Sequence, residues 1–216
     1  MTEIIFADNT PQEMRDAILS MKQIPKMNRR KLIWGKGIND ADYVTSTRTA
    51  YGNWLCPLYS RWVEVLRRSS GNANSTAYKD TTLHPDWLSF MSFRKWCLDN
   101  GWRSDYQLDK DFISDLNVYG PDTCAFIPQA LNTFIVDCSA TRGSYPIGVS
   151  KAGNKFQSHC SNPVTKKGEY LGLFDTPEEA HNAWKQKKHG HALALADMYP
   201  DLDPRVLTAL KTKYVD

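Results

Sequence analysis

The fold is indicated most clearly by residues 106–134, which read YQLDKDFISDLNVYGPDTCAFIPQALNTF. The alternation of Tyr106, Leu108 and Lys110 predicts a strand, because successive side chains of a strand point to opposite faces. The segment NVYGPDT is rich in turn-forming residues, and CAFI after it predicts a second strand. Pro128 is suited to the start of a helix. The stretch therefore predicts a hairpin that is followed at once by a helix.

Polar side chains of this stretch are placed where they can form a metal site. Asp109 ends the first strand, and Asn132 lies about one turn into the helix. A hairpin backed by a helix can bring the two side chains together at one end. A carboxylate and an amide oxygen form an incomplete ligand set for a hard cation such as Mg²⁺, which keeps several waters and accepts phosphate oxygens. We therefore expect a phosphodiester-hydrolysing site that uses Mg²⁺ or Mn²⁺.

These residues also resemble a known family. LDKD followed by YGPDTCAFIPQALN is similar to the ββα-metal motif of the HNH nucleases, in the phage-encoded branch that resembles homing endonucleases. The segments GINDADY, YSRWVEVLRR and DWLSFMSFRKW add to the resemblance, which covers residues 34–135. It implies an α+β fold with a ββα-metal (HNH-like) unit and flanking helices, DNA endonuclease activity, and Asp109 and Asn132 as metal ligands. One metal site per chain favours nicking.

The position of the family's general-base histidine holds Lys110 instead. An ordinary lysine is protonated at neutral pH and acts as a base only where burial or a metal lowers its pKa. Lys110 can instead stabilise developing negative charge, with Asp111 or a metal-bound hydroxide supplying the nucleophile. The expected catalytic residues are thus Asp109, Lys110, Asp111 and Asn132. The alternative is a DNA-binding protein that retains the nuclease fold without catalysis.

Beyond residue 144 the pattern predicts a small antiparallel sheet and a helix. IGVSKAGNKFQSHCSN indicates two strands around an Ala-Gly-Asn turn, and YLGLF indicates a third. On the second strand, Lys155, Gln157 and His159 are expected on the face opposite Phe156, Ser158 and Cys160. Thr176 as N-cap, Pro177 at the first position and Glu179 in a capping box predict the start of a long helix. DPRVLTALKTKYV predicts a further short helix without an assigned role.

This second region resembles the ethylene-response-factor type of DNA-binding domain. The matching elements are GV, a lysine followed by an aromatic residue on the second strand, and LGLFDTPEEAHNAW. The resemblance implies that the sheet lies in the major groove of double-stranded DNA, with contacts from Ser150, Lys151, Lys155, Gln157 and His159. Glutamine can read adenine, and lysines can hold phosphates. Ser150 and Ala152 replace the usual arginines, so weaker base readout is expected. The alternative is an ordinary exposed strand face.

Two clusters of basic residues leave alternatives open. No acid occurs from Ala17 to Asn39, where six lysines and arginines accumulate, including Arg29 and Arg30. Such a run indicates either a solvated surface or contact with DNA phosphates. Farther along, His189 and His191 suggest either a metal site or an exposed helix end near phosphates.

Composition bounds the remaining possibilities. The chain has 216 residues, a formal net charge of +3 and five widely spaced cysteines without a CxxC pair. The cysteines predict buried free thiols, and Cys56 and His84 have no partners at zinc-ligand spacing. No apolar run is long enough to span a bilayer, and the amino terminus does not resemble a secretory signal. We expect a cytoplasmic protein, in the host cytoplasm if it is phage-encoded, with no membrane partner.

Helical periodicity and loop composition suggest an order of domains. Helices are predicted within residues 10–24, 56–70 and 84–102, and residues 35–53 are expected to be irregular. The predicted ranges are an N-terminal helix and basic segment at 1–44, the nuclease domain at 45–136, a linker at 137–144 and the sheet domain with its final helix at 145–216.

Overall fold

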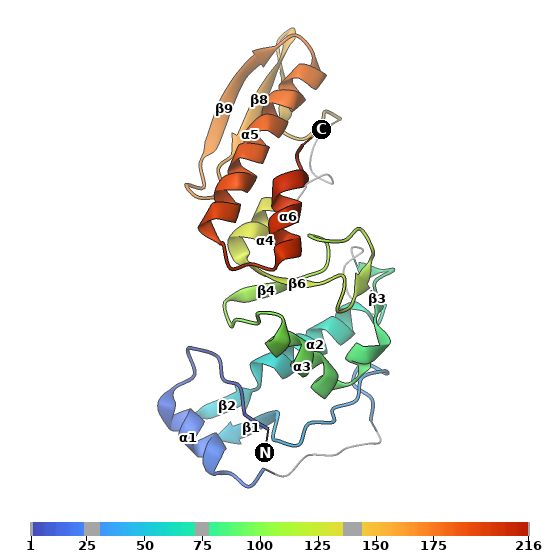
Figure 1. Cartoon of the computed structure of the whole chain (residues 1–216), viewed down its shortest axis with the longest axis vertical. Helices are drawn as coiled ribbons and strands as arrows, with labels where there is room; N and C mark the ends of the chain where they lie inside the picture. The colour runs from blue at the N-terminus through green and yellow to red at the C-terminus, as the bar shows by residue number, and fades with distance from the viewer. Residues whose placement is uncertain (1, 24–30, 72–77, 136–143, 216) are drawn as a thin grey trace. The chain divides into compact units, whose positions relative to one another are not determined.

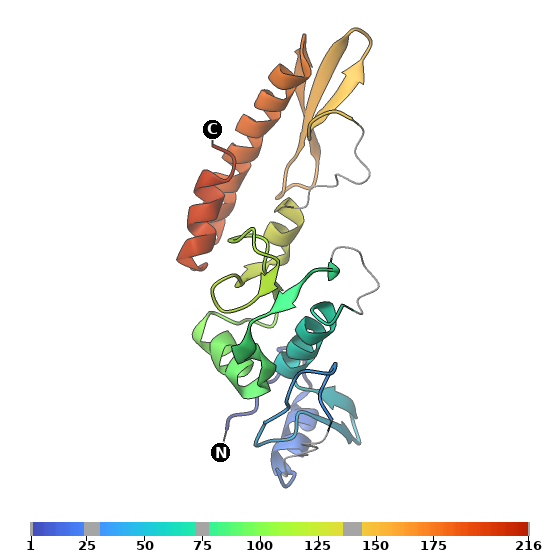
Figure 2. The same ribbon diagram turned by 90° about the vertical axis from the view of Figure 1, so that its right-hand side faces the viewer.

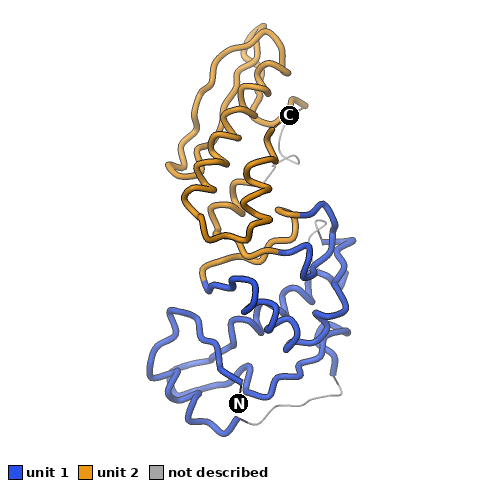
Figure 3. The backbone as a smooth tube through the Cα atoms, in the orientation of Figure 1, with its two compact units in different colours: residues 1–104, 114–124 blue, residues 105–113, 125–216 orange. Residues whose placement is uncertain are grey.

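The computed structural model describes residues 2–23, 31–71, 78–135 and 144–215 of the chain. Over these residues the protein is a mixed α+β structure with six α-helices and four small sheets. The chain forms two compact units, and Figure 3 shows them in different colours. One unit contains residues 1–104 and 114–124, and the other contains residues 105–113 and 125–216. The coarse prediction of an α+β fold is confirmed.

The first unit is mainly helical around an aromatic core. Its elements are α1 (Gln12–Ser20), β1 (Ser46–Thr49), β2 (Gly52–Leu55), α2 (Pro57–Arg68), β3 (Thr82–Leu83), the 3-10 helix η2 (Pro85–Leu88), α3 (Phe90–Asp99) and β5 (Val118–Tyr119). Trp62 and Trp87 are buried, and the Trp62 indole nitrogen donates to the carbonyl of Trp87 at 2.7 Å. The apolar stripes that predicted helices at 10–24 and 56–70 therefore face a real core.

The predicted helix at 84–102 is divided into two pieces. Ser89 has an extended backbone between η2 and α3, and its side chain accepts a hydrogen bond from the amide of Ser92. Asp40 receives hydrogen bonds from the Ser89 hydroxyl and the Met91 amide, at 2.6 and 2.9 Å. Ser89 therefore acts as an N-cap, and a single continuous helix was the wrong prediction for this segment.

Three strands of the first unit occupy stretches in which the sequence predicted none. β1 and β2 pair as an antiparallel hairpin that begins within residues 35–53, the stretch expected to be irregular, and ends at Leu55. Val118–Tyr119, in the predicted turn, forms β5 and pairs in parallel with β3. Each pairing depends on a partner strand, and for β5 that partner lies more than thirty residues away in the sequence, which local composition cannot reveal.

The second unit carries the hairpin, the helix behind it and the carboxy-terminal sheet. Its elements are β4 (Tyr106–Asp109), β6 (Ala125–Pro128), α4 (Gln129–Ile135), β7 (Val149–Ala152), β8 (Lys155–Ser161), β9 (Gly168–Phe174), α5 (Pro177–Met198) and α6 (Pro204–Thr212). β4 and β6 are antiparallel, and α4 follows β6 directly. The predicted strand–strand–helix order is thus present in this part of the chain.

The carboxy-terminal sheet has the order β7-β8-β9 and is antiparallel throughout. α5 covers one of its faces, as both views show (Figure 1, Figure 2). Thr176 and Glu179 form the predicted capping box at the start of α5, with Pro177 in the first turn. The three-stranded sheet packed on a helix is therefore confirmed.

One apolar core joins the hairpin and α4 to the two carboxy-terminal helices. Its buried residues are Phe112, Ala125, Ile127, Leu131, Phe134, Ala192, Leu195, Ala196, Leu202, Val206 and Leu210. α6, to which the sequence assigned no role, completes this core against α5. The predicted boundary at residues 137–144 lies outside the described residues, apart from Ser144, and the compact units group the chain differently from the predicted domains.

The thiols and the lengths of the helices can be compared with what the composition predicted. Cys56, Cys97, Cys124 and Cys160 are buried and form no disulfide with one another, and Cys138 lies outside the described residues. Among the described helices, none is long and apolar enough to cross a membrane.

Candidate functional site

Asp109 ends β4, and its carboxylate is engaged by the backbone that follows it. Oδ1 accepts hydrogen bonds from the amides of Asp111 at 2.9 Å and Phe112 at 2.7 Å. This arrangement turns the chain sharply after the strand, in the manner of an Asx-turn. Only Oδ2 remains for a metal ion or another ligand.

The surroundings of Asp109 change its acidity. Burial raises the pKa of its carboxyl group above the ordinary value of 3.8, and the neighbouring Asp111 charge adds to this effect. The two backbone hydrogen bonds and Lys110 act in the opposite direction without cancelling it. A metal ion bound here would reverse the balance, because a cation favours the ionised carboxylate.

Lys110 and Asp111 form an ion pair at the start of the turn. The Lys110 side chain is 6% exposed, and Nζ lies 2.5 Å from Asp111 Oδ1, whose side chain is 64% exposed. The ammonium group is thus directed to a neighbouring carboxylate rather than to solvent. This geometry provides a fixed positive charge next to Asp109.

Asn132 lies in α4, which begins directly after the end of β6. Tyr106 pairs with Pro128, directly before α4, and Asp109 pairs with Ala125 at the opposite end. The strand separates these ends by about 10 Å. The Asn132 side chain is half-buried, and no hydrogen bond joins it to Asp109 in the described part of the chain. The described residues thus include the two strands and the helix of the predicted site, with no hydrogen bond between its two expected ligands.

His189 and His191 of α5 were the other residues for which the sequence left a metal site open. Among the described residues, no group of three or more histidine, cysteine, aspartate or glutamate side chains is arranged to hold a metal. His191 contacts Glu169 instead, with Nε2 3.1 Å from Oε2. His189 is two residues away on α5, and side chains at this spacing do not share a helix face.

Glu169 is the centre of a polar network on β9. Its carboxylate accepts a hydrogen bond from the Asn162 amide at 2.9 Å and lies 3.0 Å from the Lys187 ammonium group. These partners lower the pKa of Glu169 to about 2, Asn162 contributing first. The network links β9 to α5, so His191 and Lys187 have structural partners.

The face of the sheet opposite α5 carries most of the residues expected to contact DNA. Ser150, Lys155, Gln157 and His159 alternate with buried residues and point away from the helix. We call this surface, with Tyr170 and Leu173 of β9, the open face. The Gln157 amide nitrogen donates to the Ser150 hydroxyl at 3.0 Å. Lys155 forms an ion pair with Asp175 at 3.0 Å.

Lys151 is the exception among the predicted contacts. It pairs with Phe156, so it belongs to the helix-covered side of the sheet, although its position on an edge strand leaves it exposed. Consecutive residues of a strand point to opposite faces, which separates Lys151 from Ser150.

A β-bulge adds two residues to the open face that the sequence pattern did not predict there. His159 pairs with Tyr170, whereas Ser158 pairs with Gly172, so Leu171 is the extra residue. Tyr170 and Leu173 are three residues apart and would face opposite sides of a regular strand. The bulge aims both outward, where they are 57% and 52% exposed. The available signal was Gly172, whose φ of +127° suits a bulge.

The basic run of the first unit is described only in part. Arg29 and Arg30 lie outside the described residues. Lys22 and Lys31 are exposed, whereas the ammonium group of Lys36 donates to the carbonyl of Ser69, and burial lowers its pKa. Lys36 therefore has a structural role.

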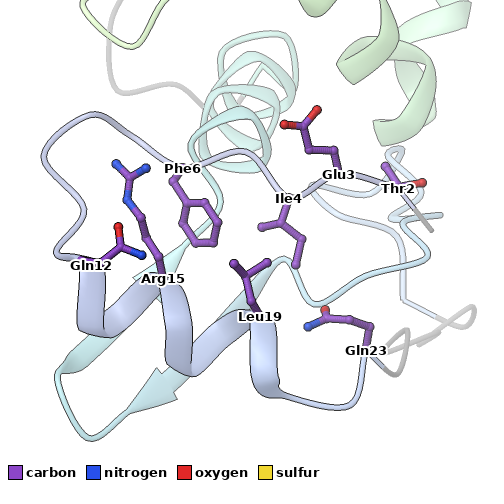
Figure 4. A pocket seen from close by; sticks show the side chains of 8 residues that line it. All are labelled: Thr2, Glu3, Ile4, Phe6, Gln12, Arg15, Leu19 and Gln23. Carbon is purple, nitrogen blue, oxygen red and sulfur yellow. The ribbon is translucent and has the colours of Figure 1, made fainter.

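The first unit also contains a cavity of about 500 Å³ beside α1 (Figure 4). Its lining includes Ile4, Phe6, Arg15 and Leu19. The Arg15 guanidinium donates to the backbone carbonyls of Thr10 and Ala7, both at 2.9 Å. The charged group thus holds the amino-terminal segment, and the lining offers no set of catalytic side chains.

Comparisons of the chain with protein-family models, with curated proteins and with solved structures find no match. The α+β class rests on the structure itself. The resemblance to HNH nucleases and to ethylene-response-factor domains remains a prediction from the motifs.

Proposed function

We propose that this protein binds double-stranded DNA through the open face of its carboxy-terminal sheet. The observation that carries the proposal is the division of the sheet into a face covered by α5 and a face of exposed hydrogen-bonding side chains. The major groove of B-DNA admits a two-stranded β-ribbon, and its base edges offer both donors and acceptors. Gln157, His159 and Ser150 supply matching groups on two adjacent strands.

The charge of the sheet supports a polyanionic partner. Residues 145–174 contain four lysines and a single acid, Glu169. That acid is paired with Lys187 and hydrogen-bonded by Asn162, so it belongs to the α5 side of the sheet. Exposed lysines at the hairpin ends, Lys155 and Lys167, can follow phosphates on either side of the groove.

The test is a salt titration of DNA affinity by fluorescence anisotropy with a short labelled duplex. Each phosphate contact contributes about 0.9 to the slope of log affinity against log salt. We expect Lys155→Ala and Lys167→Ala each to lower the slope by about that amount. Lys211→Ala, an exposed lysine of α6, is the control and should leave the slope unchanged. Parent protein without salt-dependent binding would contradict the proposal.

A second candidate function is metal-dependent hydrolysis of a phosphodiester bond, as in a phage HNH-type endonuclease. The antiparallel β4–β6 pair followed directly by α4 favours it, as do Asp109 at the strand end and the fixed charge of Lys110. Asp109 Oδ2 and the Asn132 amide oxygen would hold Mg²⁺ or Mn²⁺, which supplies charge stabilisation for the phosphate when bound. Lys110 would add to that stabilisation, and the exposed Asp111 carboxylate would accept a proton.

Nicking of supercoiled plasmid in Mg²⁺ or Mn²⁺ separates this candidate from DNA binding without catalysis. Asp109→Ala and Asn132→Ala should abolish nicking and leave DNA affinity intact. The nicking activity of Lys110→Ala shows whether the Lys110 ammonium group is needed for cleavage. Asp201→Ala removes an exposed carboxylate elsewhere and serves as the control. Tight binding by a parent protein that cuts nothing would leave the DNA-binding proposal alone.

A further inference from the structure

Two side chains of different chemistry lie side by side on the open face. Gln157 of β8 is the direct cross-strand partner of Leu173 of β9. Side chains in this relation are about 5 Å apart at their Cβ atoms, a separation between one and two base-pair steps of about 3.4 Å, so both can reach the same or adjacent base pairs. Leu173 is a large apolar side chain, 52% exposed, on a face that is otherwise polar or aromatic.

The Gln157 amide is oriented by its other neighbour. Its Nε2 donates one hydrogen to the Ser150 hydroxyl at 3.0 Å, across the β7–β8 pair. Among the described residues no other hydrogen bond engages the Gln157 side chain, which leaves its second Nε2 hydrogen and its Oε1 acceptor available to a ligand. One donor and one acceptor side by side match adenine, which presents the N7 acceptor and the N6 amino donor in the major groove.

Leu173 has a matching partner in the same groove. Thymine is distinguished there by its 5-methyl group, which binds apolar side chains. An exposed leucine next to an adenine-reading amide therefore suits an A·T base pair or a step that contains one. The β9 bulge is what places Leu173 on this face.

We propose that Gln157 and Leu173 together read A·T base pairs, Gln157 through the adenine edge and Leu173 through the thymine methyl group. This inference rests on the proposed DNA binding and adds the base preference. Ser150 is a positioning residue that orients the Gln157 amide.

The thymine arm of the test compares a duplex of alternating A·T pairs with the same duplex containing deoxyuridine in place of thymidine. The two differ only in the methyl groups. We expect the parent protein to bind the thymidine duplex about fourfold more tightly, the effect of burying one methyl group. Leu173→Ala should bind both duplexes equally. Leu193→Ala, an exposed leucine on α5, is the matched control and should keep the difference.

The adenine arm replaces adenine with 7-deazaadenine, which lacks the N7 acceptor. The parent should lose about tenfold in affinity, within the range for one bidentate contact. Gln157→Ala should be insensitive to the replacement. Ser150→Ala should retain part of the sensitivity, because it removes only the group that orients the amide.

The outcomes separate the inference from the proposed function. Salt-dependent binding with no effect of the methyl group or of N7 would overturn the A·T readout and leave DNA binding in place. A parent protein that binds none of the duplexes would overturn both. Since Leu173 and Gln157 are at the surface, unchanged melting temperatures should accompany the expected affinity changes.

Discussion

Gly148 shows how a single residue can be required by both conformation and space. Its φ is +82°, and a Cβ atom here would lie 2.1 Å from Cδ1 of Trp184. We expect Gly148→Ala to destabilise the second unit by about 3 kcal/mol, combining backbone strain with overpacking. Amide hydrogen exchange in β8 reports the stability of this unit.

Gly153→Ala separates the two contributions. Gly153 also has a positive φ, +62°, but nothing lies within 4 Å of its missing Cβ. The substitution should cost only about 1 kcal/mol from conformation. Equal effects of the two substitutions would mean that contact with Trp184 adds nothing.

The carboxyl group of Asp109 predicts how the stability of the folded protein changes with pH. Because its folded-state pKa is raised, the folded protein binds this proton more tightly than the unfolded chain, and the ionised group opposes folding at neutral pH. Asp109→Asn keeps the acceptor for the two amides and removes the charge. We expect a higher melting temperature at pH 7, with the gain disappearing as the pH falls toward the ordinary value of 3.8.

The same variant tests the metal site without any cleavage assay. If Asp109 binds Mg²⁺, added Mg²⁺ should raise the melting temperature of the parent protein and not that of Asp109→Asn. Equal responses of both proteins would argue against Asp109 as a ligand.

Among the helices, α4 and α5 are joined by a half-buried lysine, Lys188. Lys188 Nζ donates to the carbonyl of Phe134 at 2.6 Å and lies 3.6 Å from the centre of the Phe134 ring. The rings of Trp184 and Tyr214 complete its surroundings, and burial lowers the pKa of Lys188. A cation at the carbonyl end of a helix also interacts favourably with the helix dipole.

We expect Lys188→Met to weaken the docking of α4 by about 2 kcal/mol, because a carbonyl loses a charged donor while apolar packing is kept. Faster hydrogen exchange of α4 amides would show this directly. Lys187→Met is the control, since it removes a partly exposed ion pair with Glu169 of β9 and leaves the contact between Lys188 and Phe134 in place. If both substitutions leave α4 exchange unchanged, the contact with Phe134 is not a stabilising one.

At the scale of the whole molecule, the apolar core that α4 shares with α5 and α6 predicts how the stability of chain fragments will differ. Leu131 and Phe134 belong to the same buried cluster as Leu195 and Leu210. A fragment of residues 145–216 would expose the apolar faces of α5 and α6 that this cluster buries. It should melt at a lower temperature and less cooperatively than a fragment of residues 105–216. Calorimetry of both fragments is the measurement, and equal melting would show that the carboxy-terminal sheet and helices are independent of α4.

Several features could be predicted from the sequence because they depend on near neighbours. The capping box at Thr176 and Glu179, the alternation along β8 and the apolar stripe of α2 are patterns of residues within four positions of one another. These patterns predicted the α+β class, the three-stranded sheet and the common face of Lys155, Gln157 and His159, three of the four polar residues that share the open face with Tyr170 and Leu173. The resemblance to a known domain supplied the fourth, Ser150.

Other features depended on partners far away in the chain. Val118–Tyr119 became a strand because β3 lies beside it, and Ser89 ended a helix because Asp40 binds its hydroxyl and the Met91 amide. The bulge opposite Ser158 turned Tyr170 and Leu173 to one face. Local patterns fix which residues can form helices and strands, but pairing, bulges and the burial of Lys110 arise only when distant segments pack against one another.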